Sequence, residues 1–491
     1  MGGRHSYVNP VLTLLRAPGE EVSIPIYWDY QARLDHTFSA EDRAALFFYG
    51  SGDSIDIIGG RRGSVALLQG RTISFHRVRA SWEHRASDRL TLSLAPTAGW
   101  DSSTLSLSGA GAGALSRPQS ETDTTISLGL RGDAIWRASD DLELRGGVDL
   151  GADRVSYRLD RLFDQQLRNL GAPNALESVL SGVKNFRALG TYLETEVRVG
   201  RFRLTPGVRA DLLTWPGRAY LTFDPRIWAR YQLDDLTTLH AYAGVYHQAP
   251  TAVQIDPLVG NPALLPLRAN QFGIGAERKL GQLWTVRLEG YLNLRRSLPF
   301  PVDPVANGDG TFSNPLQLNS GMGHSVGLEL LVRRELSAQL YGWIAYTLSR
   351  SRELPGPGQP WRPTQYDQPH VLTMLVGYRP SPYIELSSRL RLASGNPISA
   401  ASGAVFNADS GDFTPQLRPF GEERLPGFAQ LDFELNNIWA ADTYRFQLYL
   451  DFENVFVRRN AEALVYDPSY RQFDYVHGLP FLASVGAKLS F

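Results

Sequence analysis

The chain has 491 residues, of which 43% are hydrophobic and 11% aromatic, and its 49 basic residues nearly balance 50 acidic ones. The apolar content excludes a disordered chain, and the balanced charge gives no electrostatic reason to expect binding to nucleic acid. Cysteine is absent, which excludes disulfides, thiolate metal ligands and cysteine nucleophiles, and no run of about 18 apolar residues could form a transmembrane helix.

Apolar and polar residues alternate with a period of two along most of the chain. In residues 90–94, for example, three leucines alternate with Thr91 and Ser93. The same period recurs in residues 284–289, 326–333, 431–436 and 444–453. Successive side chains of a β-strand point to opposite faces, so each segment is predicted to be a strand with one apolar and one polar face.

The connections between the predicted strands alternate strictly between short and long. The short connections are Ser39–Arg43, Ala86–Arg89, Ser139–Asp141, Asp234–Thr238, Gly281–Leu283, Ser337–Gln339, Ser381–Tyr383 and Ala440–Thr443. The long connections are Ile58–Gly70, Ser108–Glu121, Asp160–Val183, Gln254–Arg268, Pro301–Gln317, Glu353–Gln368, Ala400–Arg424 and Arg459–Gln472. Short turns at one end and long loops at the other are typical of an outer-membrane barrel, and soluble domains rarely contain so many long structureless connections.

The sequence therefore predicts an all-β fold, a transmembrane antiparallel up-and-down β-barrel with short periplasmic turns and long extracellular loops. At about 10 residues for each membrane-spanning strand, we expect about 20 strands from His5 to Phe491. Closure of the sheet removes edges that lipid cannot solvate. The alternative is a soluble β-sandwich or propeller with a binding role, but a propeller repeats a motif about every 40 residues and no such repeat is found.

Residues 160–183 break the period of two. Leucine, valine and phenylalanine recur there at helical spacings, interrupted by Gly171-Ala172-Pro173. We predict two short amphipathic helices in an extracellular loop. The loop would either cover the mouth of the barrel or simply pack against neighbouring loops.

The last residues form a strand with a distinctive outward face. Its alternating apolar positions are Phe481, Ala483, Val485, Ala487, Leu489 and the terminal Phe491. A terminal phenylalanine after such an alternation resembles the signal read by the bacterial outer-membrane insertion machinery, and Phe481, Val485, Leu489 and Phe491 are its predicted sorting residues. The alternative is an ordinary edge strand of a sandwich.

Several short motifs occur in an order that resembles a known family. They are Gly2-Gly3-Arg4-His5-Ser6-Tyr7, Tyr27-Trp28-Asp29-Tyr30-Gln31, Gly260-Asn261-Pro262, Tyr346-Thr347-Leu348-Ser349-Arg350-Ser351, Tyr366-Asp367-Gln368-Pro369-His370, Ser394-Gly395-Asn396-Pro397 and Leu450-Asp451-Phe452-Glu453-Asn454-Val455. Over residues 1–491 the chain resembles the barrel portion of TonB-dependent outer-membrane receptors. Leu267 departs from the pattern, since the family commonly has an acidic residue there.

The resemblance implies a 22-stranded barrel preceded by a signal peptide, a segment that contacts TonB and a globular plug. Met1–Ser6 lacks the features of a secretory signal, and no plug is recognisable. We therefore expect either a fragment or one half of a two-part receptor, with the plug and the first hairpin supplied in the same gene product or by a separate chain. The barrel would then have 20–22 strands.

Catalytic and metal sites are not expected. His240 and His247 are seven residues apart on one predicted strand and should face opposite sides, so they cannot share an ion. The glycines of residues 109–113 are not followed by the lysine of a phosphate-binding loop. The sequence thus indicates a protein that is not an enzyme and needs no cofactor.

Ligand contacts are expected on inward faces near the long loops, where arginine and aromatic side chains offer forked donors and stacking surfaces. The candidates are Tyr246, Arg295, Arg296, Trp361, Arg362 and Tyr366. Alternatively, the aromatic residues belong to interfacial girdles and the charged residues pair with each other.

The resemblance implies a function in the outer membrane of a Gram-negative bacterium, in contact with outer-membrane lipid. We expect the pore of an importer for a scarce, large solute, such as a metal chelate, a cofactor or an oligosaccharide. The inner-membrane TonB complex would supply energy through the plug. The alternative is an unplugged or separately plugged channel for passive diffusion or protein export.

Overall fold

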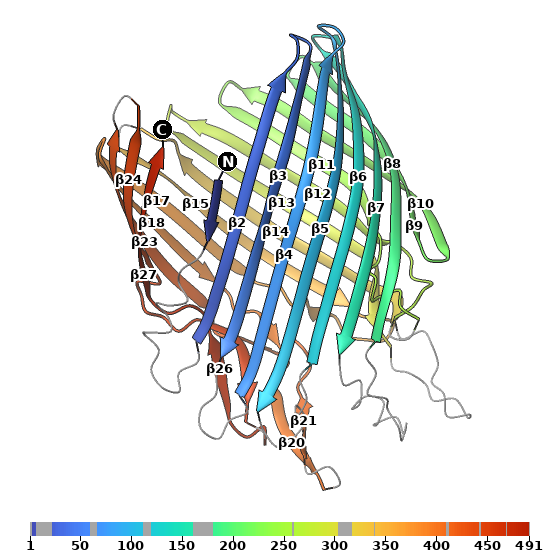
Figure 1. Ribbon diagram of the computed structural model, residues 1–491, viewed down its shortest axis with the longest axis vertical. Helices are drawn as coiled ribbons and strands as arrows, with labels where there is room; N and C mark the ends of the chain where they lie inside the picture. Colours follow the sequence, from blue (N-terminus) through green and yellow to red (C-terminus); the bar gives the residue numbers. More distant parts are fainter. Residues whose placement is uncertain are drawn as a thin grey trace.

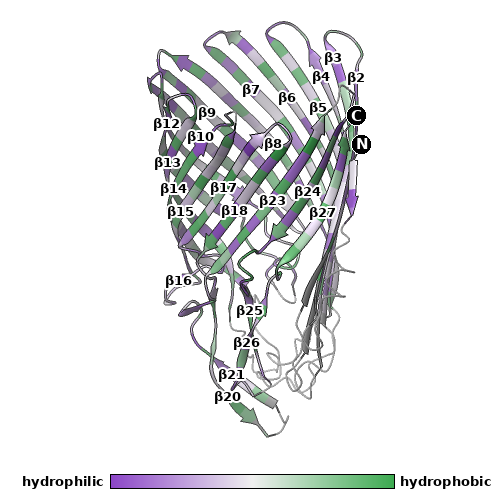
Figure 2. Ribbon diagram, turned by 90° about the vertical axis from the view of Figure 1, so that its left-hand side faces the viewer, coloured by the Kyte–Doolittle hydropathy of each residue, from purple (hydrophilic) through white to green (hydrophobic). Residues whose placement is uncertain are grey.

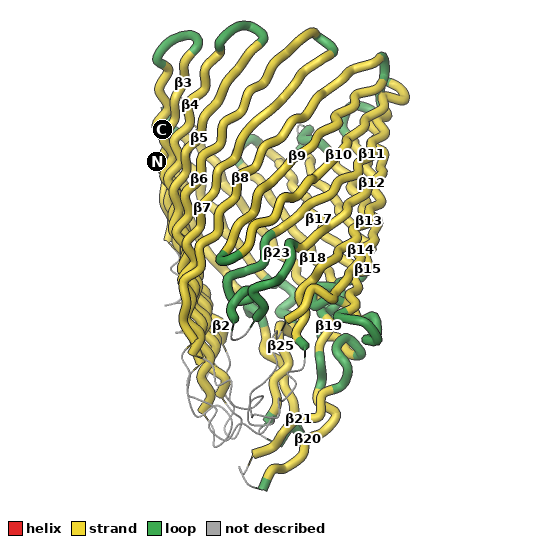
Figure 3. Tube along the Cα trace, turned by 90° about the vertical axis from the view of Figure 1, so that its right-hand side faces the viewer, coloured by secondary structure: helices red, strands yellow, loops and turns green. Residues whose placement is uncertain are grey.

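The computed structural model describes residues 2–5, 22–58, 66–110, 119–160, 180–257, 260–302, 317–337, 339–408, 412–440, 443–467 and 469–490. In these residues the chain forms strands joined by turns and loops (Figure 3). No helix that could cross a membrane occurs in this part of the chain. Of the segment predicted as two helices, Asp160 and Leu180–Val183 belong to strands, and the rest lies outside the described residues.

A single antiparallel sheet contains most of the strands (Figure 1). Its strands are β1 (Gly2–His5), β2 (Val22–Thr37), β3 (Asp42–Ile58), β4 (Ala66–Arg85), β5 (Leu90–Ala110), β6 (Gln119–Ser139), β7 (Leu142–Asp160), β8 (Leu180–Val199), β9 (Phe202–Trp215), β10 (Arg218–Asp234), β11 (Thr237–Gln248), β12 (Leu267–Leu280), β13 (Trp284–Pro301), β14 (Gln317–Arg334), β15 (Leu340–Leu354), β16 (Arg362–Pro363), β17 (His370–Ser381), β18 (Ile384–Ala393), β23 (Phe428–Ala440), β24 (Arg445–Glu453) and β27 (Leu482–Ser490). Outside this sheet, β20 (Ala401–Asn407) and β21 (Asp412–Leu417) form one small hairpin, and β25 (Ala461–Tyr466) and β26 (Phe473–His477) form another. The two-residue strands β19 (Pro397–Ile398) and β22 (Glu423–Arg424) pair with each other on either side of the β20–β21 hairpin in the chain.

The order of the strands in the sheet follows their order in the chain. Each strand pairs with the next from β1 to β15, and the sheet continues through β17, β18, β23 and β24 to β27. Of its 21 strands, only the two-residue β16 is a side pairing on β15, so 20 strands follow one another round the sheet. The sheet curls until the two chain ends lie side by side (Figures 1 and 2). These features confirm the predicted antiparallel up-and-down barrel.

The two ends of the barrel differ as expected, but short and long connections do not alternate strictly along the chain. Short turns join the strands at one end, and the long loops and small hairpins gather at the other (Figures 1 and 3). At the long-loop end, however, β9 and β10 are joined only by Pro216 and Gly217. Gly217 has φ +74°, and proline followed by a glycine of positive φ is a common pair at the centre of a type II turn. The predicted strict alternation is therefore wrong at this hairpin.

The side chains divide between an apolar outer face and a polar inner face. On β13, Glu289 is only 8% exposed whereas its neighbour Leu288 is 44% exposed. The same alternation appears as bands of opposite hydropathy along the strands (Figure 2). Large exposed apolar residues cover the outer face of a barrel that lies in lipid, whereas the polar groups face the bore.

The last strand has the predicted alternation. Val485 and Leu489 on β27 are 69% and 58% exposed on the outer face, and Phe481 stacks on Phe452 with ring centroids 6.4 Å apart. Phe491 lies outside the described residues. The role of these residues in sorting stays a prediction.

Candidate functional site: the inner wall and the long-loop rim

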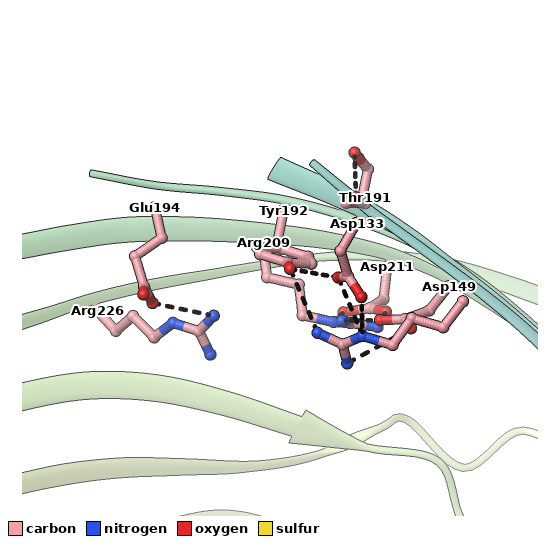
Figure 4. A network of polar contacts seen from close by, with 10 residues as sticks. Asp133, Asp149, Thr191, Tyr192, Glu194, Arg209, Asp211 and Arg226 are labelled. Atoms are coloured by element: carbon pink, nitrogen blue, oxygen red, sulfur yellow. Dashed lines mark hydrogen bonds and ion pairs between the residues drawn. The ribbon is translucent and has the colours of Figure 1, made fainter. Parts of the chain in front are cut away.

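A network of ion pairs covers the inner wall between β6 and β9. Arg209 lies at its centre and donates to Asp149 at 2.5 Å and to Asp211 at 2.7 Å. Tyr192 donates to Asp133 at 2.5 Å. In Figure 4 these side chains project from the same side of the strands, while Thr191 projects from the other. Here the charges of the inner wall pair with each other.

A second inner-wall cluster lies on β10, β11 and β13. Nε2 of His240 is 2.9 Å from Glu289, and the Tyr242 hydroxyl donates to the same carboxylate at 3.1 Å. The indole of Trp228 stacks on both rings, with centroid distances of 5.7 Å to His240 and 5.1 Å to Tyr242. His247 instead contacts Asp224 at 2.5 Å, so the two histidines have different partners. No group of three or more possible metal ligands occurs within the described ranges.

Part of this wall has polar atoms without a partner. Among the described residues, Nε of Arg226, Nε1 of Trp228, Oδ1 of Asn293 and Nε of Arg295 are buried and have no hydrogen-bond partner. All four residues lie on β10 or β13 and face the bore. Because buried polar groups are rarely left unsatisfied, this part of the wall is suited to contact with another polar surface or with solvent in the bore.

Three of the predicted ligand residues come together on the inner side. Strand register places Tyr246 and Arg295 in one row, two strands apart, and the same row ends at Glu353. Nη2 of Arg295 lies 3.2 Å from the hydroxyl of Ser351. Arg362 forms an ion pair with Glu353 at 2.9 Å, so the two arginines flank one carboxylate.

The aromatic neighbours of Arg362 complete this group. Its guanidinium carbon lies 5.5 Å from the ring centroid of Phe300 and 5.6 Å from that of Phe420. These distances are within the range of cation–π contact. The carboxylate of Glu353 is therefore paired with Arg362. Arg295 forms hydrogen bonds with hydroxyl groups and has no ion pair with a described carboxylate.

The other predicted ligand residues lie elsewhere. Arg296 faces outward opposite Met322, so its expected inward position is wrong, because neighbours on a strand face opposite sides. Trp361 packs on His324 with ring centroids 4.8 Å apart. Tyr366 is 78% exposed on the loop between β15 and β17. The structure thus groups Tyr246, Arg295 and Arg362, and separates Arg296, Trp361 and Tyr366 from them.

Motif residues that the sequence analysis did not assign to a site hold the long loops in place. Asp367 is 3% exposed, accepts the Ser351 backbone N–H at 2.6 Å and pairs with Arg424. Asn261 accepts the Ala263 N–H at 2.8 Å and donates to the Gln317 carbonyl at 2.9 Å. Each residue therefore ties a long-loop segment to a neighbouring segment.

Asn454 has the same role after β24. Its side chain is 2% exposed and donates to the carbonyls of Arg458 at 2.9 Å and Leu479 at 3.2 Å. Its backbone N–H donates to Asp432 on the inner wall at 3.0 Å. Its φ of +53° is a conformation that asparagine tolerates better than most residues. The rim of the barrel is thus fixed by buried polar residues of the motifs.

The loop between β11 and β12 packs on the inner wall against β7 and β8. Ala252 belongs to a buried cluster with Tyr157 and Leu159, which face inward on β7. The Tyr157 hydroxyl donates to Asp256, and Nζ of Lys184 lies 3.4 Å from the same carboxylate. No local sequence pattern predicts this contact, because Tyr157 and Asp256 are 99 residues apart.

Replacing Asp256 with alanine should loosen this loop. The change removes the acceptor of Tyr157 and leaves the largely buried Lys184 without its partner, which should destabilise the closed loop by about 1–3 kcal/mol. Limited proteolysis of the folded barrel should then cut residues 249–266 faster than in the parent. Asp235→Ala, in a turn at the other end, is the control, and equal cleavage of both variants would contradict a role for Asp256.

Comparison of the chain with known protein families and solved structures agrees with this fold. The chain matches the family described as "TonB dependent receptor-like, beta-barrel" over residues 26–455. No curated protein matches it significantly in sequence.

Solved structures with the same fold include three transporters or receptors. The FrpB iron transporter from Neisseria meningitidis has 14% identity and a TM-score of 0.65, with 94% of this chain and 71% of that chain covered. The copper transporter OprC has 14% identity and a TM-score of 0.66, with 95% and 72% covered. The ferripyoverdine receptor of the Pseudomonas aeruginosa outer membrane has 13% identity and a TM-score of 0.70, with 95% and 65% covered.

The family match covers most of the chain, and the structural matches show the same barrel. Membership implies an outer-membrane location, which places the short turns in the periplasm and the long loops outside the cell. The chain therefore belongs to the family of TonB-dependent receptor-like β-barrels.

Proposed function

We propose that this barrel imports a scarce solute too large for porins, with energy from the inner-membrane TonB complex. Three structures with this fold carry the names of iron, copper and ferripyoverdine proteins, which favours a metal chelate over a cofactor or an oligosaccharide. The energy would act through a plug that fills the bore, present in the same gene product or in a separate chain. Residues 1–491 would then be the barrel domain of the receptor.

The inner wall is the observation that best supports a plug. Four buried polar atoms on β10 and β13 have no partner within the described part of the chain. A polar domain in the bore would satisfy such atoms, whereas an apolar filling would leave them unpaired. Water in an open channel would satisfy them as well, and this is the alternative of passive diffusion.

We further propose Tyr246, Arg295 and Arg362 as solute contacts. Arg295 and Arg362 offer forked donors around Glu353, and Tyr246 adds an aromatic surface in the same row. Tyr366 would meet the solute first, since it is 78% exposed on the rim. Arg296 and Trp361 are not included, because their side chains contact the outward side.

The test is uptake of radiolabelled ferric chelates by cells that produce the barrel together with a family plug. The proposal predicts uptake that stops when TonB is deleted and that falls roughly tenfold or more in Arg295→Gln, since a lost charged hydrogen bond costs about that factor. Arg350→Gln, on the outer face, is the control. Uptake that is unchanged by TonB deletion would favour the passive channel.

Outer-membrane assembly should depend on the terminal phenylalanine. Deleting Phe491 from a chain supplied with a signal peptide should lower the amount of folded barrel in outer-membrane fractions, because the proposed sorting signal is lost. Ser490→Thr is a control that leaves the aromatic terminus in place. Heat-modifiable mobility on gels measures folding, and full assembly of the deletion variant would contradict the sorting proposal.

A further inference from the structure

The outer face of β7 changes from apolar to basic at one position. Its outward residues are apolar from Leu142 to Ala152. The length of this segment matches the length of about 10 residues that a strand needs to cross the membrane. The next outward residue towards the long loops is Arg154. Trp100 lies in the same row two strands away and is 40% exposed, as expected of an aromatic residue at the membrane interface. Arg154 therefore marks the extracellular boundary of the apolar band.

A second arginine lies beside Arg154. Arg187 on β8 is opposite Ala152, and Asn185 is opposite Arg154, so the two arginines are diagonal neighbours on the outer face. Diagonal neighbours are about 7–8 Å apart, which long side chains can bridge. Both arginines are exposed, and neither forms an ion pair with a described residue.

Among the described residues around this pair, no carboxylate faces outward. The outward neighbours are apolar or uncharged, among them Ile126, Leu150, Ser156, Asn185 and Thr214. The ion-pair network of Figure 4 lies on the opposite, inner face of the same strands. The two positive charges are thus uncompensated on the outer face in this part of the described structure.

An apolar groove begins at Arg187 and extends over the membrane side of the pair. Its volume is about 510 Å³, and it crosses four adjacent strands, β6 to β9. Its apolar lining includes Leu128, Leu130, Leu150, Ala152, Leu189 and Leu212. Strands are about 4.8 Å apart, so the groove is wide enough for more than one acyl chain.

We propose that this surface binds a phosphorylated, multiply acylated glycolipid of the outer leaflet, of the lipid A type. The acyl chains would lie in the groove, and the phosphate groups would accept hydrogen bonds from Arg154 and Arg187. Arginine binds phosphate in a forked, charge-assisted geometry, and the groove supplies apolar contact directly below. The site depends on the position of the barrel in the membrane and not on the transported solute.

The test is a titration of the full folded chain in detergent micelles with diphosphoryl lipid A, followed by native mass spectrometry. Arg154→Gln/Arg187→Gln should bind the lipid roughly tenfold more weakly or worse, since two charge-assisted hydrogen-bonding groups are removed. The matched control is Arg268→Gln/Arg350→Gln, because both arginines are exposed on outward faces away from the groove. Heat-modifiable mobility confirms that each variant is folded.

Two further measurements distinguish the contribution of the phosphorylated head group of the lipid from that of its acyl chains. Ala152→Trp fills the groove and should weaken binding while both arginines are kept, and lipid A without phosphates should bind the parent and the double variant equally. Unchanged affinity of Arg154→Gln/Arg187→Gln would overturn the proposal. Equal binding of phosphatidylglycerol and lipid A would also overturn it, because the site would then not distinguish a multiply acylated glycolipid.

Discussion

Arginine at Leu448 should lower the free energy of unfolding of the barrel in a membrane by about 2–4 kcal/mol. Leu448 is on β24, is 37% exposed and faces outward, opposite Ala487 of the last strand. A charged side chain at that position would have to leave water for the apolar part of the bilayer. The cost is largest near the middle of the membrane and falls towards its surfaces.

Arginine at the neighbouring Gln447 is the matched control. Gln447 faces the bore and donates to Asn436 at 2.6 Å, so arginine there loses one hydrogen bond and stays among polar groups. We expect a cost of about 1 kcal/mol. Unfolding titrations in lipid vesicles measure both values, and equal destabilisation of the two variants would show that the assigned faces of β24 are wrong.

Arg424→Ala should be the most damaging single change at the long-loop rim. It removes the partner of Asp367, whose carboxylate is 3% exposed and would remain buried without its ion pair. Loss of one partner of a buried pair is costly, and because Arg424 is itself partly exposed we expect a loss of about 2–3 kcal/mol. Arg424 also donates to the Gly395 carbonyl at 3.2 Å, so the segments around 367 and 395 should loosen together.

The control for this change lies in the same loop. Arg418 pairs with Glu423 at 2.9 Å, but both side chains are at least 42% exposed, so Arg418→Ala should cost no more than about 1 kcal/mol. Hydrogen exchange of the Ser351 amide, which donates to Asp367, reports directly on the rim. If exchange at Ser351 rises equally in both variants, Asp367 does not fix the rim through Arg424.

The architecture could be predicted from the sequence because each strand has its own local signal. The alternation of apolar and polar residues, as in residues 444–453, indicates which side chains face lipid. This inference does not depend on which strands lie next to the segment. The structure confirms about 20 strands and a sheet ordered as the chain is. Pro216-Gly217 is itself a local signal for a type II turn, whereas the strict alternation of short and long connections predicts a long loop at that position.

The site could be predicted only in part. The inward positions of Tyr246 and Arg295 follow from strand alternation, whereas the predicted inward position of Arg296 contradicts it, because Arg295 and Arg296 are adjacent on one strand. Contacts such as Tyr157 with Asp256 join residues 99 positions apart and depend on how a loop folds over the bore. The rim residues belong to recognisable sequence motifs, but their burial and hydrogen bonds arise only when distant loops are brought together.

We propose that this chain forms a wide polar bore that a plug fills. The most direct measurement is the conductance of the purified 491-residue chain in a planar lipid bilayer, before and after a plug polypeptide with its hairpin is added. With 20 strands the bore exceeds that of porins, whose about 16–18 strands already leave a water-filled channel. The account predicts a large, ohmic, TonB-independent conductance that the plug lowers, and a chain that conducts no ions yet supports energy-dependent uptake alone would contradict it.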